Sequence, residues 1–405
     1  MSVVFDRPYE FVPPHRGKLW PGFIQAFRIV DWYLRKKEGV VGYECRGLEY
    51  LEASLDRGDG IMLAPNHCRY ADPLVLGWPA RELGTAVYAV ASWHLFNKGR
   101  LDAFAIRRMG GFSINREGMD RQSLETAIDI LATAERPLIL FPEGTTTRTN
   151  DVLKPLLDGV LFIARSAARR RAKATKGRVV MHPVAIKYLC ESNFTDWADR
   201  QLSRIENRLG WQKPIDRSIV QRTIRLAEGL LSLKEVEYFG ETKCGELPER
   251  RDKLIAHLLI RTEQRLGIEP KEEEVAGRVR AIRSEVVTKF FETKDTDQQT
   301  RLRNDVAAAE LAQELMSYPD CYLQADQVTD TRIVETIQRM QESLFGRADT
   351  SIPLRAVIQC DEAILVPAEK AQRGEGDPLM RQLQDRLTSM LAALSQEARE
   401  IPVSP

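Results

Sequence analysis

The sequence lacks any long apolar stretch. Of its 405 residues, 43% are hydrophobic and 29% are charged, the balance of an ordinary globular protein and not of a disordered one. No segment reaches the length and apolarity of a membrane-spanning helix. Because the N-terminus, Met1–Pro8, has no basic region followed by an apolar run, we expect no signal peptide. The length allows two domains.

Cysteine, histidine and net charge are also scarce. The six cysteines are dispersed, which favours free thiols in a reducing compartment, the cytoplasm, over a disulfide framework. The five histidines and the cysteines show no zinc-ligand spacing, so we expect no metal. A formal net charge of +1 gives no global attraction to nucleic acid, and no aromatic residues interleave the basic segments. We therefore expect no nucleic-acid partner.

A buried strand that runs into a histidine is the strongest local signal. The apolar run 60–64 is bounded by glycine and by Pro65, which ends the strand and leaves His67 just beyond its carboxyl end. Open α/β sheets bind ligands at that edge. Asp72, five positions later, can bond one ring nitrogen of His67 and leave the other as a base. The alternative is a structural histidine, with Asp72 capping the helix that begins near Pro73.

Three further motifs in the same half of the chain each contain or follow a short predicted strand. They are Gly110–Arg116, Phe141–Arg148 and Met181–Ile186. Together with Asn66, His67 and Asp72, they resemble, in the same order, the four sequence blocks of the phospholipid/glycerol acyltransferase family, and most closely its lysophosphatidate acyltransferases. The resemblance covers roughly residues 40–190.

The resemblance implies an enzyme that moves a fatty acyl group from acyl-CoA or acyl carrier protein to a hydroxyl of glycerol phosphate or a lysophospholipid. This reaction belongs to phospholipid biosynthesis or remodelling. It needs no bound cofactor, and the implied location is peripheral, on the inner face of the cell membrane. In the HX4D motif, His67 would be the general base and Asp72 its orienting partner. Arg116 would contact the acceptor phosphate, and the acceptor wall would consist of Glu143, Gly144 and Thr145.

Two residues depart from this pattern or compete with it. Family members that act on lysophosphatidate usually carry arginine where this chain has Thr146, so the acceptor head group stays open, and Arg148 is the basic residue that would substitute. Cys68 offers a rival thiolate nucleophile. We favour a packed cysteine, because adjacent side chains point apart and His67 is poorly placed to activate it.

Two other functions remain open. One is acyl transfer to a different acceptor, such as a lyso-aminolipid. The other is a lipid- or acyl-carrier-binding module without catalysis, against which the intact motif residues argue. Turnover distinguishes the enzyme from the binding module.

A basic segment without acidic residues follows the third motif. It either forms a solvated helix face or contacts the phosphates of coenzyme A, acyl carrier protein or anionic lipid. Its basic residues are Arg165, Arg169, Arg170, Arg171, Lys173, Lys176 and Arg178.

Three regions are expected along the chain. Residues 1–38 contain an amphipathic helix over 19–34, which either lies in a membrane interface or packs on the sheet. Residues 39–195 alternate strands and helices, which predicts an α/β domain with a mainly parallel sheet flanked by helices, the glycerolipid acyltransferase fold of the resemblance. Residues 196–405 are expected to be mostly helical, with a strand pair near 354–366 that forms a hairpin or returns to a sheet.

Overall fold

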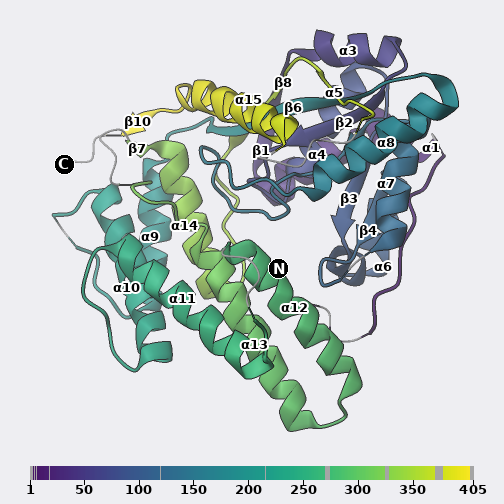
Figure 1. Cartoon of the computed structure of the whole chain (residues 1–405). Coiled ribbons are helices and arrows are strands. Elements are labelled where there is room, and N and C mark those ends of the chain that lie inside the picture. The colour runs from purple at the N-terminus through teal and green to yellow at the C-terminus, as the bar shows by residue number, and fades with distance from the viewer. Residues whose placement is uncertain are drawn as a thin grey trace.

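The protein is described here from a computed structural model of the whole chain. The structure describes residues 3, 5, 7–17, 19–118, 120–214, 216–269, 274–323, 328–369 and 377–401. Figure 1 shows two bodies side by side, a sheet flanked by helices and a body made of long helices.

An eight-stranded, mostly parallel sheet forms the first body within the described residues. The strand order is β1-β8-β6-β2-β5-β3-β4, with β9 also paired to β6. β8 and β9 run antiparallel to β6, and the other pairings are parallel. The strands are β1 (Val40–Arg46), β2 (Gly60–Pro65), β3 (Tyr88–Ser92), β4 (Gly111–Ile114), β5 (Leu138–Ile139), β6 (Val179–Cys190), β8 (Leu354–Cys360) and β9 (Ile364–Leu365). The predicted α/β fold class is confirmed.

The central strands are covered on both faces. All six residues of β2 and all twelve of β6 are buried, as expected for nearly continuous apolar runs in a parallel sheet. Ile61 and Leu63 of β2 face one apolar cluster, and Met62 and Ala64 face another. The strand that leads to His67 is therefore held rigidly from both sides.

Helices cover both faces of the sheet. One face packs against α7 (Arg121–Thr133), α8 (Gly159–Thr175) and α15 (Pro378–Ser395). The other packs against α9 (Thr195–Arg208) and α14 (Asp330–Phe345). The remaining elements of this body are α3 (Leu48–Asp56), α4 (Asp72–Val75), α5 (Gly77–Glu82), the 3-10 helix η2 (Trp93–Asn97) and α6 (Arg100–Arg108).

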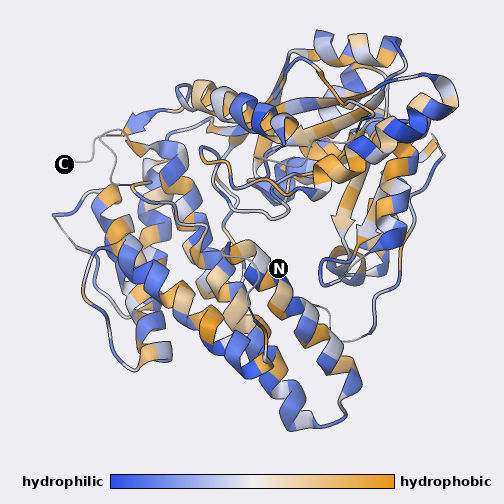
Figure 2. Cartoon of the chain, viewed as in Figure 1, coloured by the Kyte–Doolittle hydropathy of each residue, from blue (hydrophilic) through white to orange (hydrophobic). Residues whose placement is uncertain are grey.

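The second body contains long amphipathic helices, which carry both orange and blue residues along their length in Figure 2. Besides α9 and α14, they are α10 (Ile219–Phe239), α11 (Leu247–Leu266), α12 (Val275–Glu292) and α13 (Thr296–Leu315). Gly240, Gly267 and Gly346 end helices in the left-handed conformation, as expected from their positions in the sequence. The pair β7 (Val328–Thr329) and β10 (Glu400–Ile401) is antiparallel.

The structure decides between the two predicted alternatives for the strand pair near 354–366 and differs from the prediction for the first helix. β8 does not form a hairpin with β9. It inserts between β1 and β6, so the C-terminal region completes the sheet of the N-terminal one. The helix expected over 19–34 is divided into α1 (Leu19–Ala26) and α2 (Ile29–Tyr33), because Arg28 adopts a positive φ of 49°. A short π-helical turn, η1 (Leu34–Glu38), then leads to β1.

Candidate active site

The loop after β2 is fixed by the side chain of Asn66. Pro65 cannot donate a backbone hydrogen bond. Asn66 instead donates from Nδ2 to the Ile186 carbonyl oxygen at 3.0 Å and accepts from the Ile186 amide at 2.7 Å. This amide pair extends the contact between β2 and β6 by one residue and sets the direction in which His67 leaves the sheet.

His67 and Asp72 form a buried pair. His67 Nδ1 lies 2.8 Å from Asp72 Oδ2, at the start of α4. Asp72 is fully buried and also accepts the Arg69 amide at 2.8 Å and the Tyr188 hydroxyl at 2.7 Å. With the carboxylate on Nδ1, the imidazole carries its proton there, and Nε2 is left as a base. The predicted relation between these two residues is therefore present in the structure.

The second ring nitrogen of His67 faces a hydroxyl group. His67 Nε2 lies 3.0 Å from Thr146 Oγ1, and the Phe141 ring stacks on the imidazole with centroids 3.9 Å apart. A general base needs the hydroxyl that it deprotonates at this distance and on this nitrogen. Thr146 drew attention in the sequence only as a departure from the usual arginine, and its contact with His67 was not predicted.

Glu143 ties the third motif to the backbone of His67. Its Oε1 accepts the His67 amide at 2.6 Å, and its Oε2 accepts the Lys154 amide at 2.9 Å. Burial raises the pKa of Glu143 to about 8, although both amide bonds favour the charged form. The side chain therefore positions the loop.

The other two residues of the expected acceptor wall shape the same loop. Gly144 has a positive φ of 67°, and a Cβ there would meet Leu157 Cδ1 at 2.4 Å. Thr145 Oγ1 accepts a hydrogen bond from Gln313 of α13 at 3.0 Å. The helical body thus contacts the loop directly.

Arg116 contacts this loop from the end of the edge strand β4. It follows β4 by two residues, and its Nη2 donates to the Gly144 carbonyl oxygen. Burial, followed by the positive charge of Arg283 of α12, lowers the pKa of Arg116 to about 10. The guanidinium groups of Arg116 and Arg283 therefore lie near each other beside this loop. Arg283 was not predicted from the sequence. It lies in an amphipathic helix more than 160 residues from Arg116, and no local motif distinguishes it from the other arginines of that helix.

Arg148 is not free to contact an acceptor phosphate. Its Nε and Nη2 donate to the two carboxylate oxygens of Glu342 on α14, at 2.7 and 2.6 Å. The side chain is buried, and its residue has a positive φ of 52°. This bidentate ion pair occupies the guanidinium and fastens the third motif to the helical body.

The arginines of α8 lie at the opposite end of the sheet. Arg171 donates to the carbonyl oxygens of Ala132 and Gly58 at 2.8 and 2.5 Å. Gly58 precedes β2 and His67 follows it, and a six-residue strand is roughly 20 Å long. Arg170 pairs with Glu125. The structure therefore does not bring Arg169, Arg170 and Arg171 to the site around His67.

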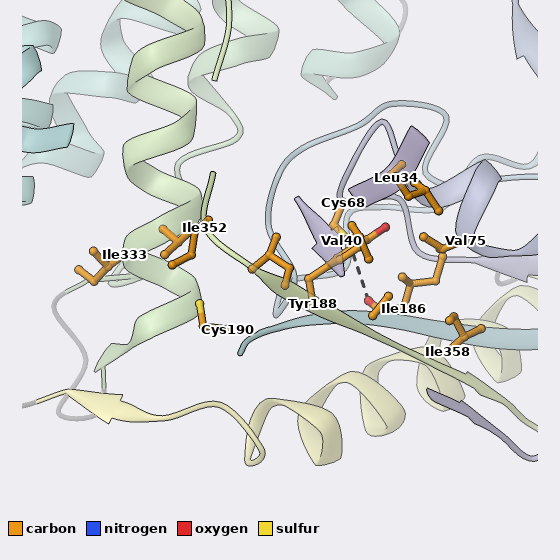
Figure 3. Packing of buried hydrophobic residues seen from close by; sticks show 14 of the residues in the cluster. Leu34, Val40, Cys68, Val75, Ile186, Tyr188, Cys190, Ile333, Ile352 and Ile358 are labelled. Carbon is orange, nitrogen blue, oxygen red and sulfur yellow. Dashed lines mark hydrogen bonds between the residues drawn. The ribbon is translucent and has the colours of Figure 1, made fainter. Parts of the chain in front are cut away.

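Cys68 is a packed side chain. It is 1% exposed and lies among Val40, Ile186 and Tyr188, with its sulfur 3.9 Å from the Ile186 carbonyl oxygen (Figure 3). Burial, and then the charge of Asp72, hold the pKa of this thiol well above its ordinary value. A thiolate nucleophile at this position is therefore disfavoured.

Sequence reasoning also missed two residues that support the pair. Tyr188, near the end of β6, hydrogen-bonds Asp72, and Asn150 bonds the backbone amide and carbonyl of Tyr188 at 3.1 and 3.2 Å. Neither position has a local sequence signal. Within the ranges that the structure describes, no three His, Cys, Asp or Glu side chains lie close enough to hold a metal ion.

A strand-end histidine, its buried carboxylate and a facing hydroxyl define a site for activating an alcohol. Residues 42–187 match the family model described as Acyltransferase, from β1 to β6 and across all four motifs. This part of the chain is therefore similar to acyltransferase domains. A comparison with curated proteins finds no match.

Proposed function

We propose that the protein transfers a fatty acyl group from a thioester of coenzyme A or acyl carrier protein to a hydroxyl of a glycerol-phosphate or lysophospholipid acceptor. The observation that carries the proposal is the position of His67. Its Nδ1 is fixed by a buried carboxylate, and its Nε2 lies at hydrogen-bond distance from a hydroxyl oxygen. An alcohol is a poor nucleophile until a positioned base takes its proton.

The geometry supports a direct transfer. The acceptor hydroxyl replaces Thr146 Oγ1 beside His67 Nε2, which takes the proton as the oxygen attacks the thioester carbonyl carbon. The tetrahedral intermediate then collapses, the carbon–sulfur bond breaks, and the imidazolium returns the proton to the thiolate. The products are an ester and a free thiol. Asp72 stabilises the imidazolium during the step.

The cations around Arg116 support a phosphorylated acceptor. Arg116 contacts the loop that positions His67, and Arg283 lies close enough to lower its pKa. Arg283 Nη2 also lies 3.6 Å from Glu310 Oε1, so its charge is partly compensated. Its buried Nε has no hydrogen-bond partner among the described residues and can donate to an acceptor phosphate. Because Arg148 is paired with Glu342, it does not contribute.

An exposed aromatic patch supports action at a membrane surface, which we propose is the inner face of the cell membrane. Trp20 packs against Phe104 of α6 and against Phe23, which contacts Phe27, with ring centroids 4.6–6.1 Å apart. Basic residues lie beside the patch and at the end of η1. Among the helices described, none is long and apolar enough to cross a bilayer. The patch consists of Trp20, Phe23, Phe27 and Phe104, and the exposed apolar residues of the same helices and of α2 are Leu19, Ile29, Trp32, Tyr33 and Leu101.

Thiol release from acyl-CoA by the purified protein tests the proposal. Glycerol 3-phosphate, lysophosphatidate, head-group-substituted lysophospholipids and monoacylglycerol serve as acceptors, and acyl carrier protein is the second donor. Release should depend on a phosphorylated acceptor and fall by about 100-fold or more in His67→Ala. Arg283→Met should raise the KM for the phosphorylated acceptor and leave that for monoacylglycerol unchanged. Absence of release with every donor and acceptor would favour the binding-module alternative.

A further inference from the structure

A cavity lies within the helical body, apart from the site around His67. It has a volume of about 360 Å³ and is bounded by α10, α11, α13 and α14. This volume is at the lower end of the range of about 300–1,000 Å³ that is usual for small-molecule sites. Its wall is mostly apolar, with side chains that include Ile224, Leu230, Leu247, Leu311, Leu315 and Leu344.

One buried cation forms part of this apolar wall. Arg339 of α14 is 3% exposed, donates from Nη2 to the Arg148 carbonyl oxygen at 2.9 Å, and lies over the Tyr318 ring at 4.5 Å. Its Nε and Nη1 are buried and have no hydrogen-bond partner in the part of the chain that the structure describes. A guanidinium in an apolar wall with two unsatisfied nitrogens is unfavourable unless an anion meets it.

The other charged residues of the wall do not neutralise Arg339. Arg251 pairs with Asp320 at 2.8 Å, and Lys234 pairs with Glu237 at 2.8 Å. Glu314 also lines the cavity, and burial raises its pKa. Within the described ranges, Arg339 has no carboxylate within ion-pair distance. The wall therefore combines an apolar surface with a guanidinium that no carboxylate of the described residues pairs, and with the carboxylate of Glu314.

We propose that this cavity binds a long-chain fatty acid, with the hydrocarbon chain along the apolar wall and the carboxylate at Arg339. A single cation matches a monoanionic head group, and the volume suits one hydrocarbon chain and not the two of a membrane phospholipid. The site goes beyond the proposed reaction, since no step of acyl transfer uses it. It adjoins the catalytic loop through Arg339, which donates to the Arg148 carbonyl oxygen.

Calorimetric titration of the full-length protein with dodecanoate, below its micelle concentration, tests the site. We expect saturable binding of one molecule per chain, with dodecan-1-ol binding at least about tenfold more weakly because it lacks the charge. Arg339→Met should weaken dodecanoate binding by a similar factor. Arg261→Met, on an exposed position of α11, is the matched control and should leave the affinity unchanged.

Ala227→Trp keeps Arg339 and fills the cavity, so it should abolish binding even if Arg339→Met does not fold. His67→Ala should bind dodecanoate as the wild type does, which separates this site from the catalytic one. The proposal is overturned by the absence of saturable binding, by undiminished binding in Ala227→Trp, or by equal affinity for dodecan-1-ol. Tighter binding of lysophosphatidate, lost in Ala227→Trp, would assign the cavity to a phospholipid and overturn the fatty-acid assignment.

Discussion

Replacing Asp72 by asparagine separates the electrostatic part of the mechanism from its geometry. Asp72 is fully buried, and Oδ2 accepts from His67 Nδ1 and the Arg69 amide, while Oδ1 accepts from the Tyr188 hydroxyl. In Asp72→Asn the amide oxygen can keep the first two bonds, and the amide nitrogen can donate to the Tyr188 oxygen. The hydrogen bonds survive, but the negative charge that stabilises the imidazolium is lost.

The loss of catalytic rate and the loss of stability should differ in magnitude. A positioned base contributes about 10²–10⁴-fold to the rate, or roughly 3–5 kcal/mol. We therefore expect kcat/KM for thiol release to fall by about 10²–10³-fold in Asp72→Asn. Because the hydrogen bonds are kept, the free energy of unfolding should fall by less than about 2 kcal/mol, measured by urea denaturation. Tyr188→Phe, which removes only the contact to Oδ1, should lose much less activity. Activity within threefold of wild type in a folded Asp72→Asn variant would refute the role of the pair.

Four further outcomes are expected. Thr146→Val should keep activity within about tenfold of wild type, since its hydroxyl gives way to the acceptor; a loss of 100-fold or more in steady-state assays would instead make that hydroxyl part of the chemistry. Arg148→Met should lower the free energy of unfolding, measured in urea, by about 2 kcal/mol. The loss is smaller than for a fully buried ion pair because the Glu342 side chain is 27% exposed. The KM for the acceptor should be nearly unchanged. In the folded protein the pKa of Glu143 is raised from 4.5 to about 8. Between these two pH values the folded protein holds a proton that the unfolded chain has released, so the contribution of this group to the free energy of unfolding falls as pH rises. The melting temperature of Glu143→Gln should therefore fall less than that of the wild type between pH 5 and pH 8. An identical pH dependence of the two melting temperatures would contradict the raised pKa. Phe27→Asp, at a position 69% exposed, should reduce sedimentation with anionic liposomes without lowering the melting temperature, and undiminished sedimentation would exclude the aromatic patch as the membrane contact.

Local patterns were sufficient to predict the motif-bearing part of the sheet. Short apolar runs that end in proline or glycine predicted the strands before His67 and before Glu143, and the spacing from His67 to Asp72 predicted their contact. These features depend on a few consecutive residues.

Features that join distant parts of the chain could not be predicted in the same way. β8 lies between β1 and β6, but its seven residues look like those of any short strand, and pairing partners are not encoded locally. The ion pair of Arg148 with Glu342 joins residues 194 positions apart. The sequence does not distinguish an arginine that binds phosphate from one that forms an ion pair with a distant helix.

Detection of the ester product by mass spectrometry tests the central claim most directly. The purified protein is incubated with acyl-CoA or acylated carrier protein and with lysophosphatidate, in parallel with His67→Ala. The account predicts an acceptor heavier by one acyl group with the wild type, formed together with one thiol per ester, and a rate at least about 100-fold lower with the variant. Equal amounts of ester with both proteins would contradict the role of His67, and no ester with any donor or acceptor would contradict acyl transfer itself.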